Sequence, residues 1–390
     1  MDKTQSEELL GKVLADVSRA FYLSMRILPA SCRPAVSLGY LLARAADTLA
    51  DNSNRTPEER LKDLRTWKAI VAGGSGEEDR SRFWRDMRLY VRQAAEKSEL
   101  PKGAAPSVPA GPEELDGEEL KSCIEILERN GRAGRDTGIT AGEGRLLLRL
   151  SEVYELFMSL DDFALGEVRD VVSTLISGME WDLSYFPGIF TKNEELERYT
   201  YLVAGCVGRF WTHVTAHYLG AVKPEDMERA ELLGVSFGKA LQYTNILRDL
   251  PKDLRSGRCY IPCEVLAQFL PGGSPHRSLE SCRVYLKPFV AAALEHFRKA
   301  LEYIKMTPKR FILLRLSTIW PVAIGLGTFA AMGESRFWPA FGKRVKVSRR
   351  WVYAMILLSL LLVPSNTLLE AAFNYWEKRI ENEFERDSEP

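Results

Sequence analysis

Two pairs of aspartates, each with four-residue spacing, are the residues of this sequence best suited to chemistry. Asp47 and Asp51 lie in AADTLADN, and Asp249 and Asp253 lie much later, in RDLPKD. Residues four apart share one face of a helix, and a carboxylate that faces a protein interior is costly unless it is paired or bound to metal. Mg²⁺ is usually held by one or two carboxylates together with substrate phosphates. We therefore expect each pair to bind Mg²⁺.

Each pair ends a longer polar stripe at helical spacing. The stripes consist of Tyr40, Arg44, Asp47 and Asp51, and of Gln242, Asn245, Asp249 and Asp253. One such pair alone is common on solvated helix faces, but two led by polar residues favour a metal–diphosphate site, where metal stabilises the leaving diphosphate. Pro251 lies inside the second pair, so we expect that helix to bend or end there.

The elements that carry these stripes are predicted to be helices throughout. Helical periodicity dominates the sequence and no alternating strand pattern is present, so the fold class is all-α. The expected helices cover two or more segments within 5–50, then 57–71, 81–97, 144–182, 193–219, 225–250, 279–305 and 310–332, with a last one near 366. Residues 97–119 are proline-rich and predict a loop. Thr367 and Glu370 have the spacing of a capping box for the last helix.

Composition excludes several classes of protein. The 390 residues contain 53 Lys and Arg against 53 Asp and Glu, so no basic surplus indicates a nucleic-acid partner. The six cysteines form no CxxC pair, which predicts reduced thiols and no structural zinc site. The N-terminus is too polar for a signal peptide. Residues 316–333 and 351–369 are uncharged; the first is interpreted as a buried core helix, and the second leaves a membrane role open.

Four motifs together resemble the squalene/phytoene synthase family. They are SRAF (18–21), GYLLARAADTLAD (39–51), RYTYLVAGCVG (198–208) and LQYTNILRDLPKDLRSGRCYIP (241–262). Their order and spacing agree with the family over roughly residues 10–70 and 145–335. The resemblance implies an all-α isoprenoid-synthase fold, with residues 1–390 forming one domain around a central cavity. Residues 72–143 are longer than the family pattern.

The resemblance also implies roles for individual residues. Asp47, Asp51, Asp249 and Asp253 would ligate Mg²⁺, and Asp47 and Asp249 would thereby act in catalysis. Tyr199 and Tyr40 would face the reacting carbons or the released diphosphate. The groups implied to bind diphosphate are Arg19, Arg44, Gln242, Asn245 and Arg258. Small residues Ala204, Gly205 and Gly208 beside Tyr199 would let either a ligand chain or another helix approach closely.

The C-terminal third decides between products within the family. Residues 319–350 resemble the squalene-synthase continuation, which implies condensation of two farnesyl diphosphates through presqualene diphosphate to squalene, with reduction by NADPH. No dinucleotide-binding GxGxxG fingerprint is present, so Lys346 and Arg349 are the candidates for holding NADPH. Two further possibilities stay open: a phytoene or dehydrosqualene synthase without reduction, and a non-catalytic relative that binds lipid.

The expected partners and location follow from the same features. Farnesyl diphosphate is the implied substrate, no nucleic acid is expected, and the protein is predicted to be a monomer. The apolar and amphipathic segment 351–385 follows a basic run. We therefore expect a cytoplasmic protein that is attached peripherally to the cytoplasmic face of the membrane.

Overall fold

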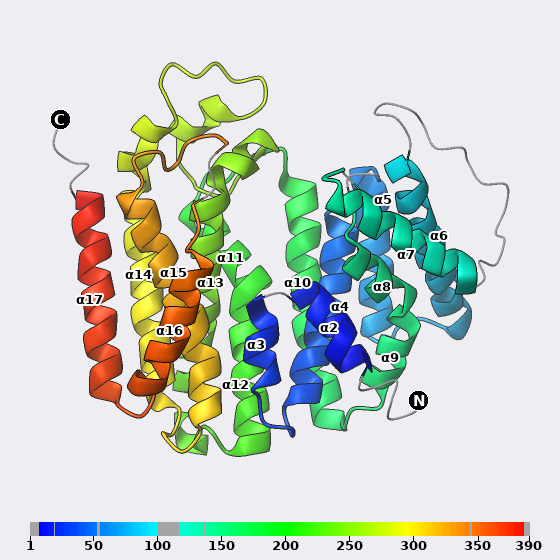
Figure 1. The fold of residues 1–390 in the computed structure, drawn as a ribbon, viewed down its shortest axis with the longest axis horizontal. Helices are drawn as coiled ribbons and strands as arrows, with labels where there is room; N and C mark the ends of the chain where they lie inside the picture. Colours follow the sequence, from blue (N-terminus) through cyan, green and yellow to red (C-terminus); the bar gives the residue numbers. More distant parts are fainter. Residues whose placement is uncertain are drawn as a thin grey trace. The chain divides into compact units, whose positions relative to one another are not determined.

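The computed structural model describes residues 8–18, 20–52, 55–99, 117–135, 137–342 and 345–385. The chain forms two compact units, here called unit 1 (Met1–Tyr22 and Arg33–Ser184) and unit 2 (Leu23–Cys32 and Tyr185–Pro390). Helices make up nearly all of both units, as the sequence predicts (Figure 1). The expected proline-rich loop at 97–119 lies mostly outside the described residues.

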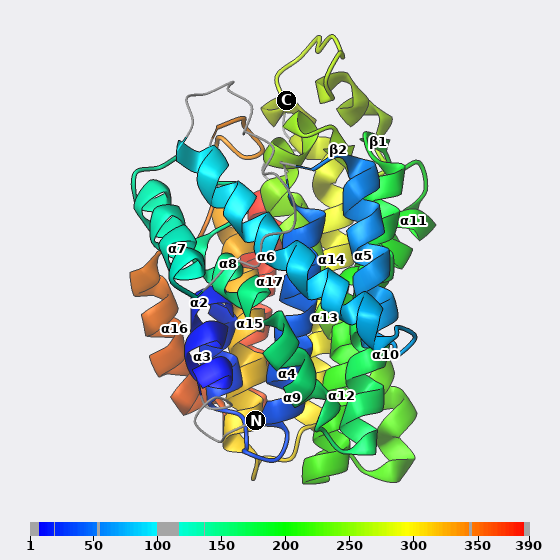
Figure 2. The same cartoon turned by 90° about the vertical axis from the view of Figure 1, so that its right-hand side faces the viewer.

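Unit 1 is built around α4, which carries the first aspartate pair. Its elements are η1 (Leu9–Val13), α2 (Leu14–Ser18), α3 (Ala20–Arg26, which ends in unit 2), α4 (Arg33–Ala50), α5 (Pro57–Val71), α6 (Glu77–Glu99), α7 (Gly117–Arg132), α8 (Ala141–Leu148), α9 (Leu150–Met158) and α10 (Asp162–Tyr185). Helices α5, α8 and α9 all pack against α4 (Figure 2).

The sequence explains how α4 is held. Leu38, Leu41 and Leu42 are fully buried on its apolar face. Helix α5 begins with a capping box between Thr56 and Glu59. From this helix the indole nitrogen of Trp67 donates a 3.2 Å hydrogen bond to the carbonyl oxygen of Leu42. The polar stripe of α4 is thus fixed by burial of the opposite face.

Unit 2 is built around the long helix α13, which carries the second aspartate pair. Its elements are β1 (Gly188–Ile189), α11 (Asn193–Thr200), η2 (Tyr201–Gly205), α12 (Cys206–Leu219), η3 (Pro224–Asp226), α13 (Met227–Arg255), β2 (Arg258–Cys259), η4 (Glu264–Phe269), η5 (Glu280–Cys282), α14 (Arg283–Met306), α15 (Ile312–Glu334), α16 (Arg349–Leu362) and α17 (Asn366–Glu385). The two short strands are parallel and pair Gly188 with Arg258.

The small residues of the VAGCVG segment serve helix packing. A Cβ atom on Gly208 would lie 1.8 Å from the carbonyl oxygen of Gly234, and one on Gly238 would lie 2.1 Å from that of Ala204. These glycines therefore let η2 and α12 approach the backbone of α13. The sequence left open whether these small residues make room for a ligand chain or for another helix. The contacts of the glycines are explained by packing against another helix.

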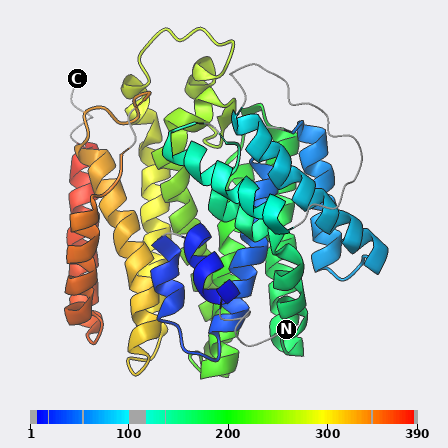
Figure 3. The same ribbon diagram turned by 45° about the vertical axis from the view of Figure 1, so that its right-hand side comes forward.

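The C-terminal helices α15, α16 and α17 lie side by side, in orange to red in Figure 3. Among the described helices, Ile312–Glu334 alone is long and apolar enough to cross a membrane, and 67% of its most apolar window is buried in the protein. That burial agrees with a core helix. Helix α17 buries Leu369, Phe373, Ile380 and Phe384, as its apolar stripe predicts.

Two local expectations need correction. Of the bend or end expected at Pro251, the end does not occur, because helix α13 continues to Arg255. The N-terminus of α17 is capped by Ser365, whose hydroxyl accepts from the Leu368 N–H at 3.3 Å, rather than by Thr367. Ser365 lies directly after Pro364, where the chain cannot continue the previous helix, so the new helix starts at the first available hydroxyl.

Candidate active site

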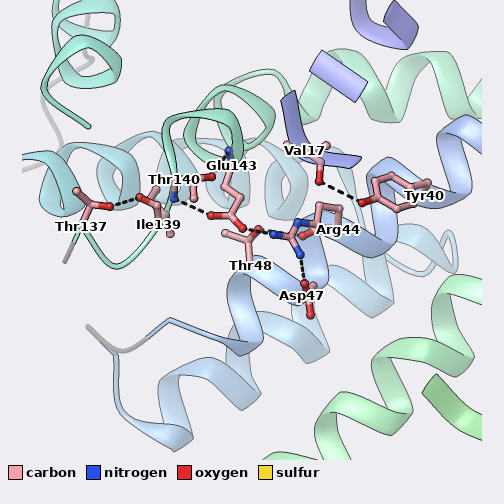
Figure 4. Close-up of polar contacts among 9 residues, drawn as sticks. All are labelled: Val17, Tyr40, Arg44, Asp47, Thr48, Thr137, Ile139, Thr140 and Glu143. Atoms are coloured by element: carbon pink, nitrogen blue, oxygen red, sulfur yellow. Dashed lines mark hydrogen bonds and ion pairs between the residues drawn. The ribbon is translucent and has the colours of Figure 1, made fainter. Parts of the chain in front are cut away.

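Arg44 joins the polar stripe of α4 to the neighbouring helix α8 (Figure 4). The guanidinium of Arg44 donates to Asp47 on its own helix and to Glu143 on α8. Glu143 also accepts from the Thr140 N–H at 2.7 Å and so caps α8. Tyr40, one turn earlier on α4, donates a 3.1 Å hydrogen bond to the carbonyl oxygen of Val17. Tyr40 and Arg44 are therefore held by residues from outside α4, and Asp47 is held by Arg44 on the same helix.

Negative charge exceeds positive charge around Asp47. Desolvation by the surrounding protein, followed by the negative charge of Asp51, raises the pKa of Asp47 to about 6. Arg44 lowers this pKa, whereas Glu143 raises it. The side chain of Asp47 still keeps 40% of its surface exposed, so its oxygens are within reach of an ion from solvent. A cation bound here would relieve the repulsion between these carboxylates.

The donor set on α4 fits Mg²⁺ with a phosphate ligand. Asp51 follows α4 at helical spacing, because its N–H donates to the Asp47 carbonyl oxygen at 3.0 Å. No group of three or more His, Cys, Asp or Glu side chains in the described part of the chain is arranged to hold a metal. Two carboxylates suit Mg²⁺, which takes its other ligands from water and phosphate. The buried Arg44 Nε has no hydrogen-bond partner among the described residues and remains as a donor.

The polar stripe of α13 is organised differently. Arg248 donates to both carboxylate oxygens of Asp249, at 3.1 and 2.5 Å. Asn245 donates to the side-chain oxygen of Gln242 at 3.3 Å, one turn earlier. Because α13 continues through Pro251, Asp253 lies on the same helix, four residues after Asp249. Sequence reasoning assigned no role to Arg248, although this residue lies within the fourth motif, directly before Asp249.

A tryptophan explains why α13 continues through Pro251. Proline has no N–H and leaves the carbonyl oxygen four residues earlier without its helical donor. That oxygen belongs to Leu247, and it accepts a 3.0 Å hydrogen bond from the indole nitrogen of Trp338. Trp338 is 2% exposed, so the bond is made in the core of unit 2. A proline inside a predicted helix is therefore a signal in the sequence. It indicates that the carbonyl oxygen four residues earlier needs a hydrogen-bond donor from outside the helix.

Tyr199 lies at the end of α11 in an aromatic cluster. Its ring stacks on that of Tyr260 with centroids 4.7 Å apart, and it meets the edge of Phe190 at 5.8 Å. Tyr260 follows the strand β2, which contains Arg258. The structure thus brings Tyr199 next to the Gly-Arg-x-Tyr segment, and the π-helical turn η2 begins two residues after it.

A partly buried ionic network ties α11, α13 and α14 together. Glu197 accepts from Lys239 at 2.5 Å and from the Tyr243 hydroxyl at 2.6 Å, and His296 lies 3.5 Å away. The hydrogen bond from His296, with those from Lys239 and Tyr243, holds the pKa of Glu197 well below its usual range. Sequence reasoning missed this network. In the sequence, Tyr243 directly follows Gln242, and Glu197 lies two residues before Tyr199.

The residues predicted to hold NADPH are not brought into these clusters. Arg19 lies outside the described residues. Lys346 and Arg349 are exposed, at the N-terminal end of α16. No hydrogen bond or ion pair in the described part of the chain joins either of them to another predicted site residue.

Comparison with known proteins identifies the family. A family model described as squalene/phytoene synthase matches residues 14–105 and 157–351, most of the chain. The chain belongs to the squalene/phytoene synthase family. Both aspartate pairs lie within the matched segments, whereas α8 and Glu143 lie in the interval between them. Arg44 is therefore held by a residue from outside the part of the chain that matches the family.

Curated members of the squalene/phytoene synthase family differ in the product that they make. Presqualene diphosphate synthase of Rhodopseudomonas palustris is 26% identical over 297 residues, covering 75% of this chain and 77% of that protein. A bifunctional lycopene cyclase/phytoene synthase of Blakeslea trispora is 26% identical, covering 64% of this chain but 31% of that protein. Squalene synthase of Schizosaccharomyces pombe is 23% identical, covering 62% of this chain and 52% of that protein.

Solved structures show the fold. The complex of TcSQS with the ligand E5700 has a TM-score of 0.63 and 18% identity, over 97% of this chain and 98% of that one. A dehydrosqualene synthase complex has a TM-score of 0.51 and 16% identity. The fold is the all-α isoprenoid-synthase fold. Family membership makes the protein a transferase-type enzyme of isoprenoid biosynthesis.

Proposed function

We propose that the protein condenses two molecules of farnesyl diphosphate through presqualene diphosphate to squalene, with reduction by NADPH. The observation that carries the first step is the pair of aspartate stripes on α4 and α13, each within a segment that matches the family. Each stripe also has an arginine beside its first carboxylate, Arg44 or Arg248. Carboxylates with adjacent guanidinium groups suit a metal-bound diphosphate.

The residues of each stripe have separate tasks in this proposal. Asp47 and Asp51, and likewise Asp249 and Asp253, would hold Mg²⁺ through carboxylate oxygens. When bound, Mg²⁺ would neutralise the charge that develops on the leaving diphosphate. Arg44 would bind phosphate oxygens, and Gln242, Asn245 and Arg258 would bind the diphosphate near α13. Arginine suits this task because its planar guanidinium can make two parallel bonds to phosphate.

Aromatic side chains would stabilise the carbocation intermediate. The stacked rings of Tyr199 and Tyr260 offer π faces, which attract positive charge without supplying a nucleophile. Tyr199 and Tyr40 would face the reacting carbons or the released diphosphate, and Tyr199 would take part in proton transfer. No nucleophilic side chain is needed, because departure of diphosphate generates the electrophile.

The second step distinguishes the candidates within the family. The resemblance of residues 319–350 to squalene synthases supports reduction, with Lys346 and Arg349 holding the phosphates of NADPH. A second candidate product is presqualene diphosphate itself, which the similarity to the Rhodopseudomonas palustris enzyme favours. A phytoene or dehydrosqualene synthase would omit the reduction, and a lipid-binding relative would lack activity altogether.

Product analysis tests these candidates together. Purified protein is incubated with farnesyl diphosphate and Mg²⁺, with or without NADPH, and the products are separated by mass. We expect squalene with NADPH, and presqualene diphosphate or dehydrosqualene without it. Presqualene diphosphate under both conditions would favour the second candidate. No magnesium-dependent consumption of substrate would contradict an enzymatic role. Geranylgeranyl diphosphate in place of farnesyl diphosphate tests the chain length.

A further inference from the structure

Helix α16 exposes most of its apolar side chains. Leu357 is 66% exposed and Leu361 72%, and Leu358, Leu360 and Tyr353 are exposed between 42% and 63%. The one fully buried residue of this helix is a serine, Ser359, whose hydroxyl accepts from the Trp320 indole at 2.9 Å. A helix that buries its serine and exposes its leucines reverses the usual pattern of a soluble protein.

The exposed surface extends past the end of α16. Ile312 and Leu313, at the start of α15, are 47% and 51% exposed, and Leu368, at the start of α17, is 49% exposed. We call α16 with these three residues the leucine edge. All of these residues belong to unit 2, in which α15 packs against both α16 and α17.

A buried arginine makes the leucine edge rigid. Arg315, which is fully buried, donates to the carbonyl oxygens of Thr307 at 2.7 Å and Val363 at 3.1 Å, and to Asn366 Oδ1 at 2.7 Å. It therefore fixes the α14–α15 turn to the α16–α17 turn. The leucines are presented by an ordered structure rather than by a frayed helix end.

Basic residues flank the leucine edge at both ends of α16. Arg350, which has no role in the proposed NADPH site, lies at its N-terminal end, and Lys309 and Arg310 lie in the turn that Arg315 joins to its C-terminal end. All three are exposed. The sequence from Ser335 to Leu369 contains no aspartate or glutamate, although the whole chain balances 53 acidic against 53 basic residues. The segment that contains α16 therefore carries only positive charge.

We propose that the leucine edge docks on an anionic membrane surface, with α16 lying in the plane of the interface. Interfacial helices bury apolar side chains at the headgroup–acyl boundary and keep cations at the headgroups. Cations at both ends of α16 suit a helix that lies flat. At 14 residues, α16 is too short to span a bilayer. Docking of this kind would place the protein peripherally on the cytoplasmic membrane face.

A second copy of the chain fits this surface less well. In a two-fold dimer each patch meets itself, so the two basic groups of one copy would face those of the other. The segment supplies no acidic residue between Ser335 and Leu369 to neutralise them. Anionic lipid headgroups provide that complementary charge.

Vesicle flotation of the full chain, without substrate, tests the proposal independently of the proposed reaction. Wild-type protein is expected to float with vesicles of phosphatidylcholine and phosphatidylglycerol, and less with phosphatidylcholine alone. Leu357→Asp with Leu361→Asp is expected to lower binding by about tenfold or more, because two apolar contacts are lost. The double substitution Lys309→Gln and Arg310→Gln is expected to weaken binding to the anionic vesicles alone.

Val284→Asp is the matched control, since Val284 is 46% exposed at the opposite end of α14; it is expected to float as wild type. Thermal unfolding checks that each variant folds. Failure of the wild type to float at low salt, or equal flotation of the double leucine variant, would overturn the proposal. So would light scattering that shows a lipid-free dimer which the leucine variant converts to monomer.

Discussion

The indole nitrogen of Trp338 hydrogen-bonds the Leu247 carbonyl oxygen at 3.0 Å, the oxygen that Pro251 leaves without a helical donor. The bond lets α13 continue to Arg255 and keeps Asp249 and Asp253 on one helix. Trp338 lies in the loop between α15 and α16, far from these aspartates in sequence. Correct placement of the second aspartate pair therefore depends on the C-terminal part of unit 2.

Trp338→Phe is expected to destabilise unit 2 and to impair the second aspartate pair. The substitution leaves a buried carbonyl oxygen unsatisfied, which costs about 1–3 kcal/mol. Chemical denaturation measures the loss, and kcat/KM for farnesyl diphosphate should fall with it. Trp320→Phe is the control, because its partner is the Ser359 hydroxyl, which keeps a second bond to Ile356. Equal effects of the two substitutions would contradict a special role for Trp338.

The aspartate stripes could be predicted from sequence because both lie on helices whose period is visible. The start and end of α5 were predicted at Pro57 and Val71, and the structure shows a proline and a capping box at that start. The partners of the stripe residues could not be predicted. In the sequence, Glu143 has only the spacing of a capping-box residue with Thr140. Its contact with Arg44 depends on how α8 packs against α4. Local periodicity predicts which face of a helix is polar, but not what meets it.

Glu143→Gln is expected to loosen Arg44 while α8 stays folded. Glutamine keeps an oxygen that can accept from the Thr140 N–H, but it loses the charge that holds the guanidinium. We expect kcat/KM for farnesyl diphosphate to fall by about tenfold, equivalent to about 1.4 kcal/mol, mainly through a higher KM. Thr140→Ala separates the two roles, because it weakens the cap and leaves the charge. An unchanged KM in Glu143→Gln, or an equal rise in Thr140→Ala, would show that the contact with Arg44 is structural only.

Asp47→Asn and Asp249→Asn are each expected to lower turnover by about two orders of magnitude or more, since each removes a charged metal ligand. The melting temperature should change little, because both side chains are partly exposed. Removal of divalent metal with a chelator should abolish wild-type turnover, and added Mg²⁺ should restore it. Asp79→Asn, at an exposed position in the first turn of α6, is the control and should be active. Full activity in either metal-site variant would refute the assignment of that pair.

The network around Glu197 predicts a specific dependence of stability on pH. Because hydrogen bonds from His296, Lys239 and Tyr243 hold the pKa of Glu197 below its usual range, the folded state favours its ionised form. The stabilisation is fully present above the unfolded pKa of about 4.3 and is lost as pH falls toward the lower folded pKa.

Glu197→Gln should therefore lower the melting temperature at pH 7, and the difference from wild type should shrink as the pH falls below about 4. Glutamine cannot carry the charge that Lys239 meets at 2.5 Å, so the variant lacks the interaction at every pH. Glu194→Gln, at an exposed position on the same helix, should show no such difference. Thermal melts of the three proteins across this pH range make the comparison. A gap that widens on acidification would mean that folding raises the pKa of Glu197, and that the network does not hold α11 to α13 by charge.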